Sequence, residues 1–281
     1  MPSRTALAAA THRAAHQILE QGRIFADPLA VRILGADAAS IAREADDHPS
    51  RRRMRIFIAV RTRFAEDALA AAVERGVKQL VVLGAGLDTF AYRSPLRDRL
   101  RMFEVDHPAT QAWKRRQLTE AGILAPESLT FAPVDFERET LADGLTASGF
   151  DFGQQTFFTW LGVVPYLSET AVWSTLISSL RGGAQVVFDY ADPPDTLSPK
   201  ARAFHHARSE RVQAIGEAWV TYLDAGLLHE GLRKIGFSDI EDLGPRQIAA
   251  RYFPSRASSA PERGGHVLRG ARASVIHPAA P

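Results

Sequence analysis

The chain contains no cysteine among its 281 residues, and this absence excludes disulfide bonds, thiolate zinc sites and cysteine nucleophiles. It fits a reducing compartment, and we expect a cytoplasmic location. The first fifteen residues include Arg4, His12 and Arg13, whereas a signal peptide needs an unbroken apolar stretch there, so we expect no export signal. No stretch of about 18 uncharged apolar residues occurs, and we therefore expect no membrane-spanning helix.

An excess of charge of one sign is also missing. The formal net charge is only +2, which gives no reason to expect nucleic acid or another polyanion as a partner. One dense basic patch, formed by Arg51–Arg53 with Arg55, Arg61 and Arg63, is interpreted as a solvated helix face. Hydrophobic residues make up 46% and charged residues 23%, close to the averages of globular proteins, so we expect one folded domain with an elaboration.

Patterns typical of several reaction classes are absent as well. There is no G-x-S-x-G elbow, which argues against a serine hydrolase, and there is no Walker-type phosphate loop. Among the nine histidines the only adjacent pair is His205 and His206, and neighbouring residues on a helix point about 100° apart. We therefore predict no metal site. No pattern specifies an oligomeric state.

Apolar patterning divides the chain into a helical beginning and an alternating remainder. Residues 1–76 have helical periodicity, and short strand-like runs then alternate with helix-like segments, which predicts a parallel sheet in a doubly wound α/β fold. The predicted strands are Gln79–Leu83, Arg101–Asp106, Leu129–Val134, Gln155–Trp160 and Ala184–Asp189, then Phe237–Asp242 and His266–His277 as an antiparallel edge. One domain would thus comprise a helical cap (1–76), a core (77–189), a lid insertion (190–235) and C-terminal strands (236–281).

The lid is predicted because the alternation breaks after the fifth strand. Pro193–Pro194 stops the strand, and Ser198–Pro199 begins a polar helix that carries the two adjacent histidines. A second helix follows and ends at Gly236. Its expected apolar face comprises Leu227, Leu228, Leu232 and Ile235. Between the last two strands, Ser255–Gly265 is rich in Ser, Arg and Gly and is predicted to be an exposed loop.

The clearest chemical signal is a buried strand that runs into the glycine turn Gly84-Ala85-Gly86. A side chain at either glycine would block the close approach of a ligand to the backbone. Nucleotide-like cofactors bind at such turns after a first strand, so all three residues are cofactor-binding candidates, although plain turns share the pattern. Leu87 and Asp88 occupy the place where the dinucleotide motif continues toward its third glycine, which argues against NAD.

Acidic residues end the second and third predicted strands. Asp106 lies 20 positions after Gly86, where a carboxylate can accept both ribose hydroxyls; alternatively, it caps the helix that Pro108 begins. Asp135 and Phe136 can bind an adenine amine and stack on its ring, although Asp is also a common turn residue. Asp106, Asp135 and Phe136 are therefore cofactor-binding candidates.

Aromatic residues bracket Gly162 at the end of the fourth predicted strand. Ligands bind outside the carboxyl ends of the strands in open α/β sheets, so Trp160 and Tyr166 can line a reaction pocket. Core packing explains either ring equally well. Trp160 is a cofactor-binding candidate, and Tyr166 is a candidate catalytic residue.

Several short segments, in this order, carry a resemblance to a known family. They are Ser3–Leu7, Arg13–Ala15, Ile24–Pro28, Arg61–Phe64, Leu83–Thr89, Phe103–Asp106 and Asp242–Pro245. Their combined order is more specific than any one of them. The chain resembles, over nearly its whole length, the leucine carboxyl methyltransferase family, and within it bacterial S-adenosylmethionine-dependent O-methyltransferases often linked to polyketide tailoring.

This resemblance implies a class I methyltransferase fold, a Rossmann-like seven-stranded sheet with N-terminal helices closing over S-adenosyl-L-methionine. It also implies that Arg61 pairs with the cofactor's carboxylate, a group that suits an arginine fork. Gly84–Gly86 would lie beneath the methionine part, Asp106 would hold the ribose, and Asp135 with Phe136 would face the adenine.

One position departs from the pattern that the resemblance implies. Leu161 stands where part of the family has a glutamate, so the usual acidic partner of the cofactor's ammonium group is missing. Backbone carbonyls near Gly84 or Trp160 can take its place.

The implied activity is methyl transfer to a carboxylate or hydroxyl oxygen of a small molecule of secondary metabolism, such as a polyketide-like metabolite. Orientation alone can supply about 7 to 11 kcal/mol at best, and a carboxylate acceptor needs no base. A phenol or an alcohol would benefit from one, and the candidates are Tyr166, Tyr190, His205 and His206. Two alternatives stay open: a nicotinamide-dependent oxidoreductase, and a protein that binds S-adenosylmethionine without turnover.

Overall fold

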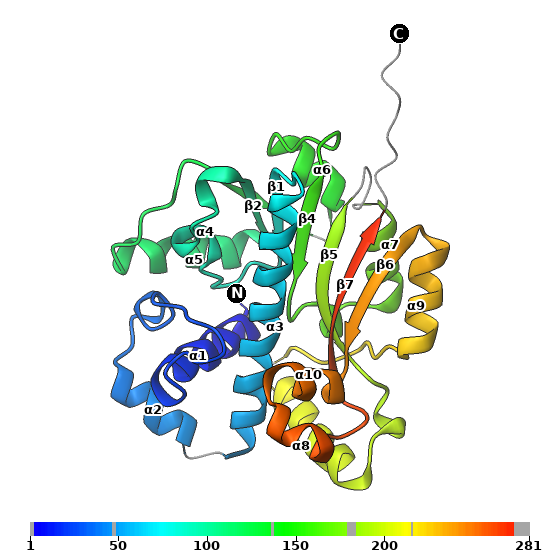
Figure 1. Ribbon diagram of the computed structural model, residues 1–281. Helices are drawn as coiled ribbons and strands as arrows, with labels where there is room; N and C mark the ends of the chain where they lie inside the picture. Colours follow the sequence, from blue (N-terminus) through cyan, green and yellow to red (C-terminus); the bar gives the residue numbers. More distant parts are fainter. Residues whose placement is uncertain (1–2, 47–48, 136–137, 179–183, 215, 273–281) are drawn as a thin grey trace.

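A seven-stranded sheet forms the centre of the protein (Figure 1). The computed structural model describes residues 3–46, 49–135, 138–178, 184–214 and 216–272. Its strands are β1 (Gln79–Leu83), β2 (Arg101–Asp106), β3 (Leu129–Pro133), β4 (Thr156–Trp160), β5 (Gln185–Ala191), β6 (Phe237–Leu243) and β7 (Gly265–Arg272). They lie in the order β3-β2-β1-β4-β5-β7-β6. Strands β1 to β5 are parallel, whereas β7 runs antiparallel between β5 and β6, which confirms the predicted α/β sheet.

The sequence predicted the strands closely because they are apolar. β1 and β2 have the predicted bounds, and β3, β4 and β5 differ from the prediction by one or two residues. Parallel strands that are covered on both faces are near-continuous apolar runs, and in β1 Val81 and Leu83 pack on one face while Leu80 packs on the other. β7 ends at Arg272, and residues 273–277 of the predicted strand lie outside the described residues.

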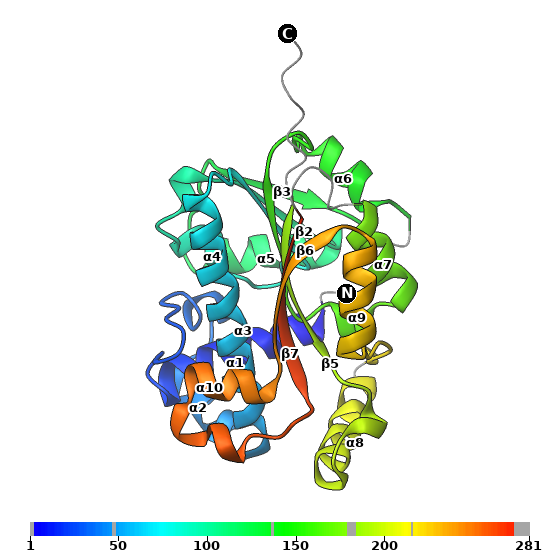
Figure 2. The same ribbon diagram turned by 45° about the vertical axis from the view of Figure 1, so that its right-hand side comes forward.

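Helices cover both faces of the sheet. The helices of the described chain are α1 (Arg4–Leu19), α2 (Ala38–Asp46), α3 (Pro49–Glu74), α4 (Phe90–Arg93), α5 (Pro108–Glu120), α6 (Leu141–Ala147), α7 (Glu169–Ser178), α8 (Pro199–Ala214), α9 (Ala225–Lys234) and α10 (Pro245–Tyr252). Short 3-10 turns are η1 (Arg32–Leu34), η2 (Arg97–Arg99), η3 (Val164–Tyr166), η4 (Pro194–Thr196) and η5 (Pro254–Ser259). Helices α6, α7 and α9 cover one face, and α3, α4, α5 and α10 cover the other (Figure 2).

The N-terminal helices form a cap at the end of the sheet where the parallel strands finish. Helices α1, α2 and α8 lie in the lower half of the molecule in both views (Figures 1 and 2). Small residues let α1 and α2 pack closely, since Ala14, Ala15 and Ala45 share one buried cluster with Ile41. Helix α3 joins the cap to the sheet, because its Val60 and Phe64 belong to the same buried cluster as Leu80 of β1. The carboxyl ends of the strands are therefore covered by helices that come from distant parts of the sequence.

The structure differs from the sequence interpretation in four details. The basic patch is not one solvated face, because Arg55 and Arg61 are buried. Helix α10 was not predicted, and part of the loop predicted at Ser255–Gly265 forms η5. In α9 the side chains of Leu228 and Leu232 are buried, but Leu227 is 70% exposed, because it points about 100° away from Leu228 around the helix. Along the part of the chain that the structure describes, no helix is long and apolar enough to cross a membrane.

The chain returns to the sheet after α8. The backbone N–H groups of Val220 and Thr221 donate to the carbonyl oxygen of Pro165 in η3, at 2.8 and 3.2 Å. Leu223 then donates to the carbonyl of Ala191 at the end of β5, at 3.0 Å. These bonds fix the segment between α8 and α9 beside the ends of β4 and β5.

Candidate active site

The glycine turn after β1 is shaped by close packing from two sides. Gly84 and Gly86 have φ angles of +65° and +45°, which L side chains rarely adopt. A Cβ at Gly84 would lie 2.3 Å from Cγ2 of Val163, and one at Gly86 would lie 3.0 Å from Cβ of Ala6 in α1. The two glycines are therefore required by the turn itself, which is pressed between the loop after β4 and the N-terminal helix.

Asp106 holds this turn in place from the end of β2. Its Oδ2 accepts a hydrogen bond from the N–H of Gly86 at 2.6 Å, and its Oδ1 accepts one from the N–H of His107 at 2.7 Å. Burial raises the pKa of Asp106, although these two N–H groups act in the opposite direction. His107, and not Asp106, caps α5, because its Nδ1 accepts from the N–H of Ala109 at 3.1 Å. Each carboxylate oxygen of Asp106 retains a second lone pair for a ligand.

Arg61 forms a buried ion pair at the ends of β4 and β5. Its Nη1 lies 2.7 Å from Oδ2 of Asp189, and the other oxygen of Asp189 accepts from the N–H of Gly162 at 2.6 Å. A Cβ at Gly162 would lie 2.6 Å from Nη2 of Arg61 and would displace the guanidinium, and the φ of +74° at this position favours glycine as well. Arg61 and Asp189 are 8% and 4% exposed. Sequence reasoning missed Asp189, although it ended the fifth predicted strand, because its partner lies 128 positions earlier.

A second buried cluster fastens the helical cap to the glycine turn. Thr89 donates to Oδ2 of Asp27 at 2.6 Å, and Arg13 and Arg93 each place Nε 3.5 Å from an oxygen of the same carboxylate. Arg13 also donates to the carbonyl of Leu87 in the turn. Asp27, Thr89 and Arg13 belong to the segments that carried the family resemblance, and the structure shows that they join these segments to one another.

The remaining predicted site residues are placed as follows. The Trp160 ring is buried and packs against Phe188 with ring centroids 6.3 Å apart, so only its backbone can reach a ligand. Tyr166 is partly buried in η3. Asp135 follows β3 and lies 3.6 Å from Nε of Arg138. Phe136 lies outside the described residues.

Asp242 organises a polar network beside the end of β5. Its carboxylate receives Tyr190 Oη at 2.5 Å, His229 Nε2 at 2.8 Å and His266 Nδ1 at 3.0 Å. The other ring nitrogen of His266 lies 3.1 Å from Asp192. Burial opposes protonation of His266, but Asp242 and Asp192 outweigh it and raise its pKa. Burial and Asp242 raise the pKa of Tyr190, so its phenol keeps its proton and donates it to Asp242.

Glu217, in the segment between α8 and α9, contacts the first turn of α1. One oxygen of Glu217 accepts from the N–H of Arg4 at 2.7 Å, and the other accepts from the hydroxyl of Ser3 at 3.2 Å and from that of Thr5. A helix N-terminus has free N–H groups and a positive dipole end, so it suits a carboxylate. This contact therefore joins the segment between α8 and α9 to the start of α1.

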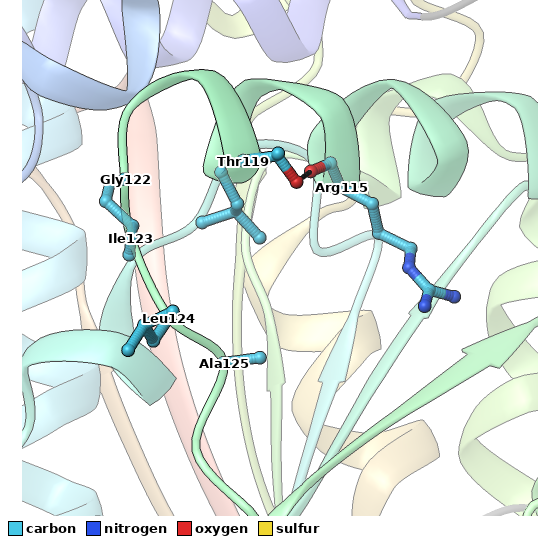
Figure 3. A pocket seen from close by; sticks show the side chains of 7 residues that line it. Arg115, Thr119, Gly122, Ile123, Leu124 and Ala125 are labelled. Atoms are coloured by element: carbon cyan, nitrogen blue, oxygen red, sulfur yellow. Dashed lines mark hydrogen bonds between the residues drawn. The ribbon is translucent and has the colours of Figure 1, made fainter.

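Two open cavities lie elsewhere on the molecule. Figure 3 shows one of them, beside the end of α5 and the loop that leads into the start of β3, at the opposite edge of the sheet from the glycine turn. It is lined by Arg115, Leu118, Thr119, Gly122, Ile123, Leu124 and Ala125. The other lies along β3 and α6. The first is lined by one ionisable side chain, Arg115, and the second by two, Glu139 and Asp143. Within the described ranges no group of three His, Asp or Glu could hold a metal ion.

Comparison with known proteins decides the family. The model of the family described as leucine carboxyl methyltransferase matches residues 6–179, more than half of the chain. The chain belongs to the leucine carboxyl methyltransferase family. It is similar to the Bacillus subtilis (strain 168) protein YktD, with 43% identity over 204 residues, 70% of this chain and 66% of YktD. A Mycobacterium marinum (strain ATCC BAA-535 / M) protein is 32% identical over 231 residues, 79% of this chain and 71% of that one.

Both relatives are named as S-adenosyl-L-methionine-dependent methyltransferases, and this chain is one of the same class. The matched region is slightly less than two thirds of YktD. Among solved structures, a Streptomyces avermitilis protein of the duf574 family has a TM-score of 0.56 at 13% identity, covering 94% of this chain and 97% of that one. This likeness shows that the two proteins share a fold over nearly their whole lengths. The family membership overturns the oxidoreductase alternative.

The described residues of this methyltransferase fit S-adenosylmethionine. The cofactor has a zwitterionic amino-acid end, a ribose and an adenine. Arg61 offers a buried guanidinium whose Nε has no hydrogen-bond partner among the described residues, at the glycine that leaves room for it. Asp106 offers a carboxylate beside the glycine turn. Cation, anion and turn therefore lie at the same edge of the sheet, where ligands of such folds bind.

Proposed function

We propose that this methyltransferase transfers the methyl group of S-adenosylmethionine to a carboxylate or hydroxyl oxygen of a small molecule, a polyketide-like metabolite being one such acceptor. The observation that carries the cofactor assignment is the buried Arg61, held by Asp189 and packed on Gly162 beside the glycine turn. The description of the family supports an oxygen acceptor, because a carboxyl group is methylated on oxygen. The absence of cysteine and the low net charge support a cytoplasmic enzyme without a nucleic-acid partner.

The proposed cofactor contacts follow the strand ends. Arg61 would bind the carboxylate, Gly84–Gly86 would lie beneath the methionine part, and Asp106 would accept from the ribose hydroxyls through its second lone pairs. Asp135 and Phe136 would face the adenine. The carbonyl of Trp160, and not its buried ring, would face the cofactor.

Catalysis would consist mainly of orienting the acceptor. When bound, the cofactor supplies an electrophilic methyl group on a sulfonium with a neutral thioether leaving group. A carboxylate acceptor needs no proton transfer, whereas a phenol or an alcohol gains from a base. Tyr190 is committed to Asp242, and His206 is exposed and lies 3.5 Å from Glu210. Tyr166 and His205 thus stay as base candidates.

The lid supplies aromatic surface for the acceptor. The ring centroid of His205 in α8 lies 5.5 Å from that of Trp219 and 5.2 Å from that of Tyr222. The segment that carries these two rings is bonded to η3, which contains Tyr166. An acceptor with a flat apolar body and one oxygen nucleophile matches this group of rings.

The proposal is tested with the purified protein and cofactor labelled in the methyl group. Small carboxylates, phenols and alcohols with aromatic bodies are offered in parallel, and labelled products are identified by mass spectrometry. Base-labile products are esters and base-stable ones are ethers. We expect transfer to at least one oxygen acceptor. Transfer only to nitrogen or carbon acceptors would contradict O-methylation, and cofactor binding without any transfer would favour the protein that binds without turnover.

A further inference from the structure

The ion pair between Arg61 and Asp189 is incomplete as a structural pair. Both side chains are at least nine-tenths buried, which is costly for charges unless their remaining hydrogen-bonding groups are satisfied. Asp189 uses one lone pair of each oxygen, toward Arg61 and toward the N–H of Gly162. Nε of Arg61 has no hydrogen-bond partner among the residues described. The pair therefore offers an unused donor and two unused acceptor positions at one place.

A zwitterion is the ligand that such a pair matches. An α-amino acid group carries a carboxylate and an ammonium separated by one carbon atom. The carboxylate can take the free donor of Arg61, and the ammonium can donate to Asp189. The neighbouring Leu161 has no charge to offer either group.

The other acids near the glycine turn are committed to different partners. Asp106 receives the N–H groups of Gly86 and His107 on the far side of β1. Asp27 accepts a hydrogen bond from the hydroxyl of Thr89 and lies between Arg13 and Arg93. Asp88 accepts from the N–H of Phe90 and lies 3.6 Å from Arg13. Asp189 is the acid that the fold places against Arg61.

We propose that Asp189 binds the α-ammonium group of the cofactor, so that Arg61 and Asp189 together form the receptor for its amino-acid end. This inference rests on the proposed placement of the cofactor's carboxylate at Arg61. It assigns to β5 a contact that the sequence resemblance expected after β4, at Leu161.

The test is calorimetric titration with S-adenosylhomocysteine and with its analogue that lacks the amino group. Wild type should bind S-adenosylhomocysteine at least tenfold more tightly, since one charged hydrogen bond corresponds to about tenfold to a hundredfold in affinity. In Asp189→Asn this preference should disappear, through weaker binding of S-adenosylhomocysteine. The analogue should bind to Asp189→Asn no more weakly than it binds to wild type, because Arg61 is still present to bind its carboxylate. The control Asp67→Asn alters an exposed partner of Arg63 and should leave both affinities unchanged.

An equal loss for both ligands in Asp189→Asn would overturn the proposal and reduce Asp189 to a residue that positions Arg61. An unchanged preference would overturn it as well. If Asp189→Asn does not fold, wild type still decides, because equal affinity for the two ligands contradicts an ammonium contact. Arg61→Lys separates the two hypotheses: it should weaken both ligands, and if it weakens neither, the placement of the carboxylate itself is wrong.

Discussion

Replacement of Asp106 by asparagine tests whether this carboxylate holds only the glycine turn or also the ribose. The carboxylate accepts from the N–H groups of Gly86 and His107, at 2.6 and 2.7 Å. Asparagine has one oxygen, so its NH₂ group must face one of these donors. Loss of one hydrogen bond to a charged group costs about 1.5 to 3 kcal/mol. At about 2 to 4 °C per kcal/mol for a domain of roughly this size, the melting temperature without ligand should fall by about 3 to 12 °C.

The ribose contact is measured separately from this loss of stability. S-adenosylhomocysteine and its 2′,3′-dideoxy analogue are titrated into wild type and into Asp106→Asn at a temperature where both proteins are folded. Wild type should prefer the ligand with hydroxyls about tenfold to a hundredfold, and the variant should lose most of that preference. Asp98 is an exposed aspartate in η2, and Asp98→Asn should change neither the free energy of binding nor the free energy of unfolding by more than about 0.5 kcal/mol.

Two results would refute this reasoning in different ways. A variant that melts earlier but keeps the full preference for ribose hydroxyls would show that Asp106 only supports the turn. A variant with unchanged melting would contradict the hydrogen bonds to Gly86 and His107.

Two further predictions concern buried charges outside the proposed cofactor contacts. The ammonium group of Lys114 lies 2.7 Å from buried Glu104, and burial raises the pKa of Glu104 to about 7. Lys114→Met removes this ammonium group and should lower the free energy of unfolding, measured by urea denaturation, by about 3 to 5 kcal/mol. The double variant Lys114→Met/Glu104→Met should lose less stability, because it leaves no unpaired buried charge. His266 lies between Asp192 and Asp242, and its raised pKa means that its stabilisation is complete below about pH 6.5 and is lost as pH rises through the folded-state pKa. The stability of wild type relative to His266→Gln should therefore shrink as the pH rises above about 6.5, and a difference that grows would contradict the charged imidazole.

The strands could be predicted because their signal is local. Five apolar runs of strand length, each followed by polar or glycine residues, mark the parallel strands, and β1 and β2 begin and end where predicted. The position of β7 between β5 and β6 carries no local signal, since the sequence alone favours pairing of neighbours along the chain. Helix α10 was missed because it has only eight residues and too few apolar ones to show a helical period.

The candidate site was predictable where one segment contains the whole pattern. The glycine turn and the acid at the end of β2 could be read from the sequence, and the structure joins them through the bond from Gly86 to Asp106. Asp189 and Glu217 could not, because each has a role only through a partner far away in sequence. The packing of Ala6 on Gly86 is likewise a contact between distant segments, and only the fold shows why the turn needs its second glycine.

The burial of Arg61 also changes how its role is best examined. Alanine at this position would leave Asp189 buried without a counter-charge and would destabilise the fold together with any loss of binding. Lysine keeps the positive charge near Asp189 but loses the planar fork that binds a carboxylate with two hydrogen bonds. Arg63, two positions along α3, pairs with exposed Asp67 and provides a matched control.

The affinity of Arg61→Lys for S-adenosylhomocysteine tests the central claim most directly. Calorimetric titration of wild type, Arg61→Lys and Arg63→Lys should show binding to wild type and to Arg63→Lys with similar affinity. Arg61→Lys should bind at least tenfold more weakly while it melts within a few degrees of wild type, about the change expected for one charged hydrogen bond. Unchanged affinity in Arg61→Lys, or equal losses in the two variants, would contradict a cofactor site built on Arg61.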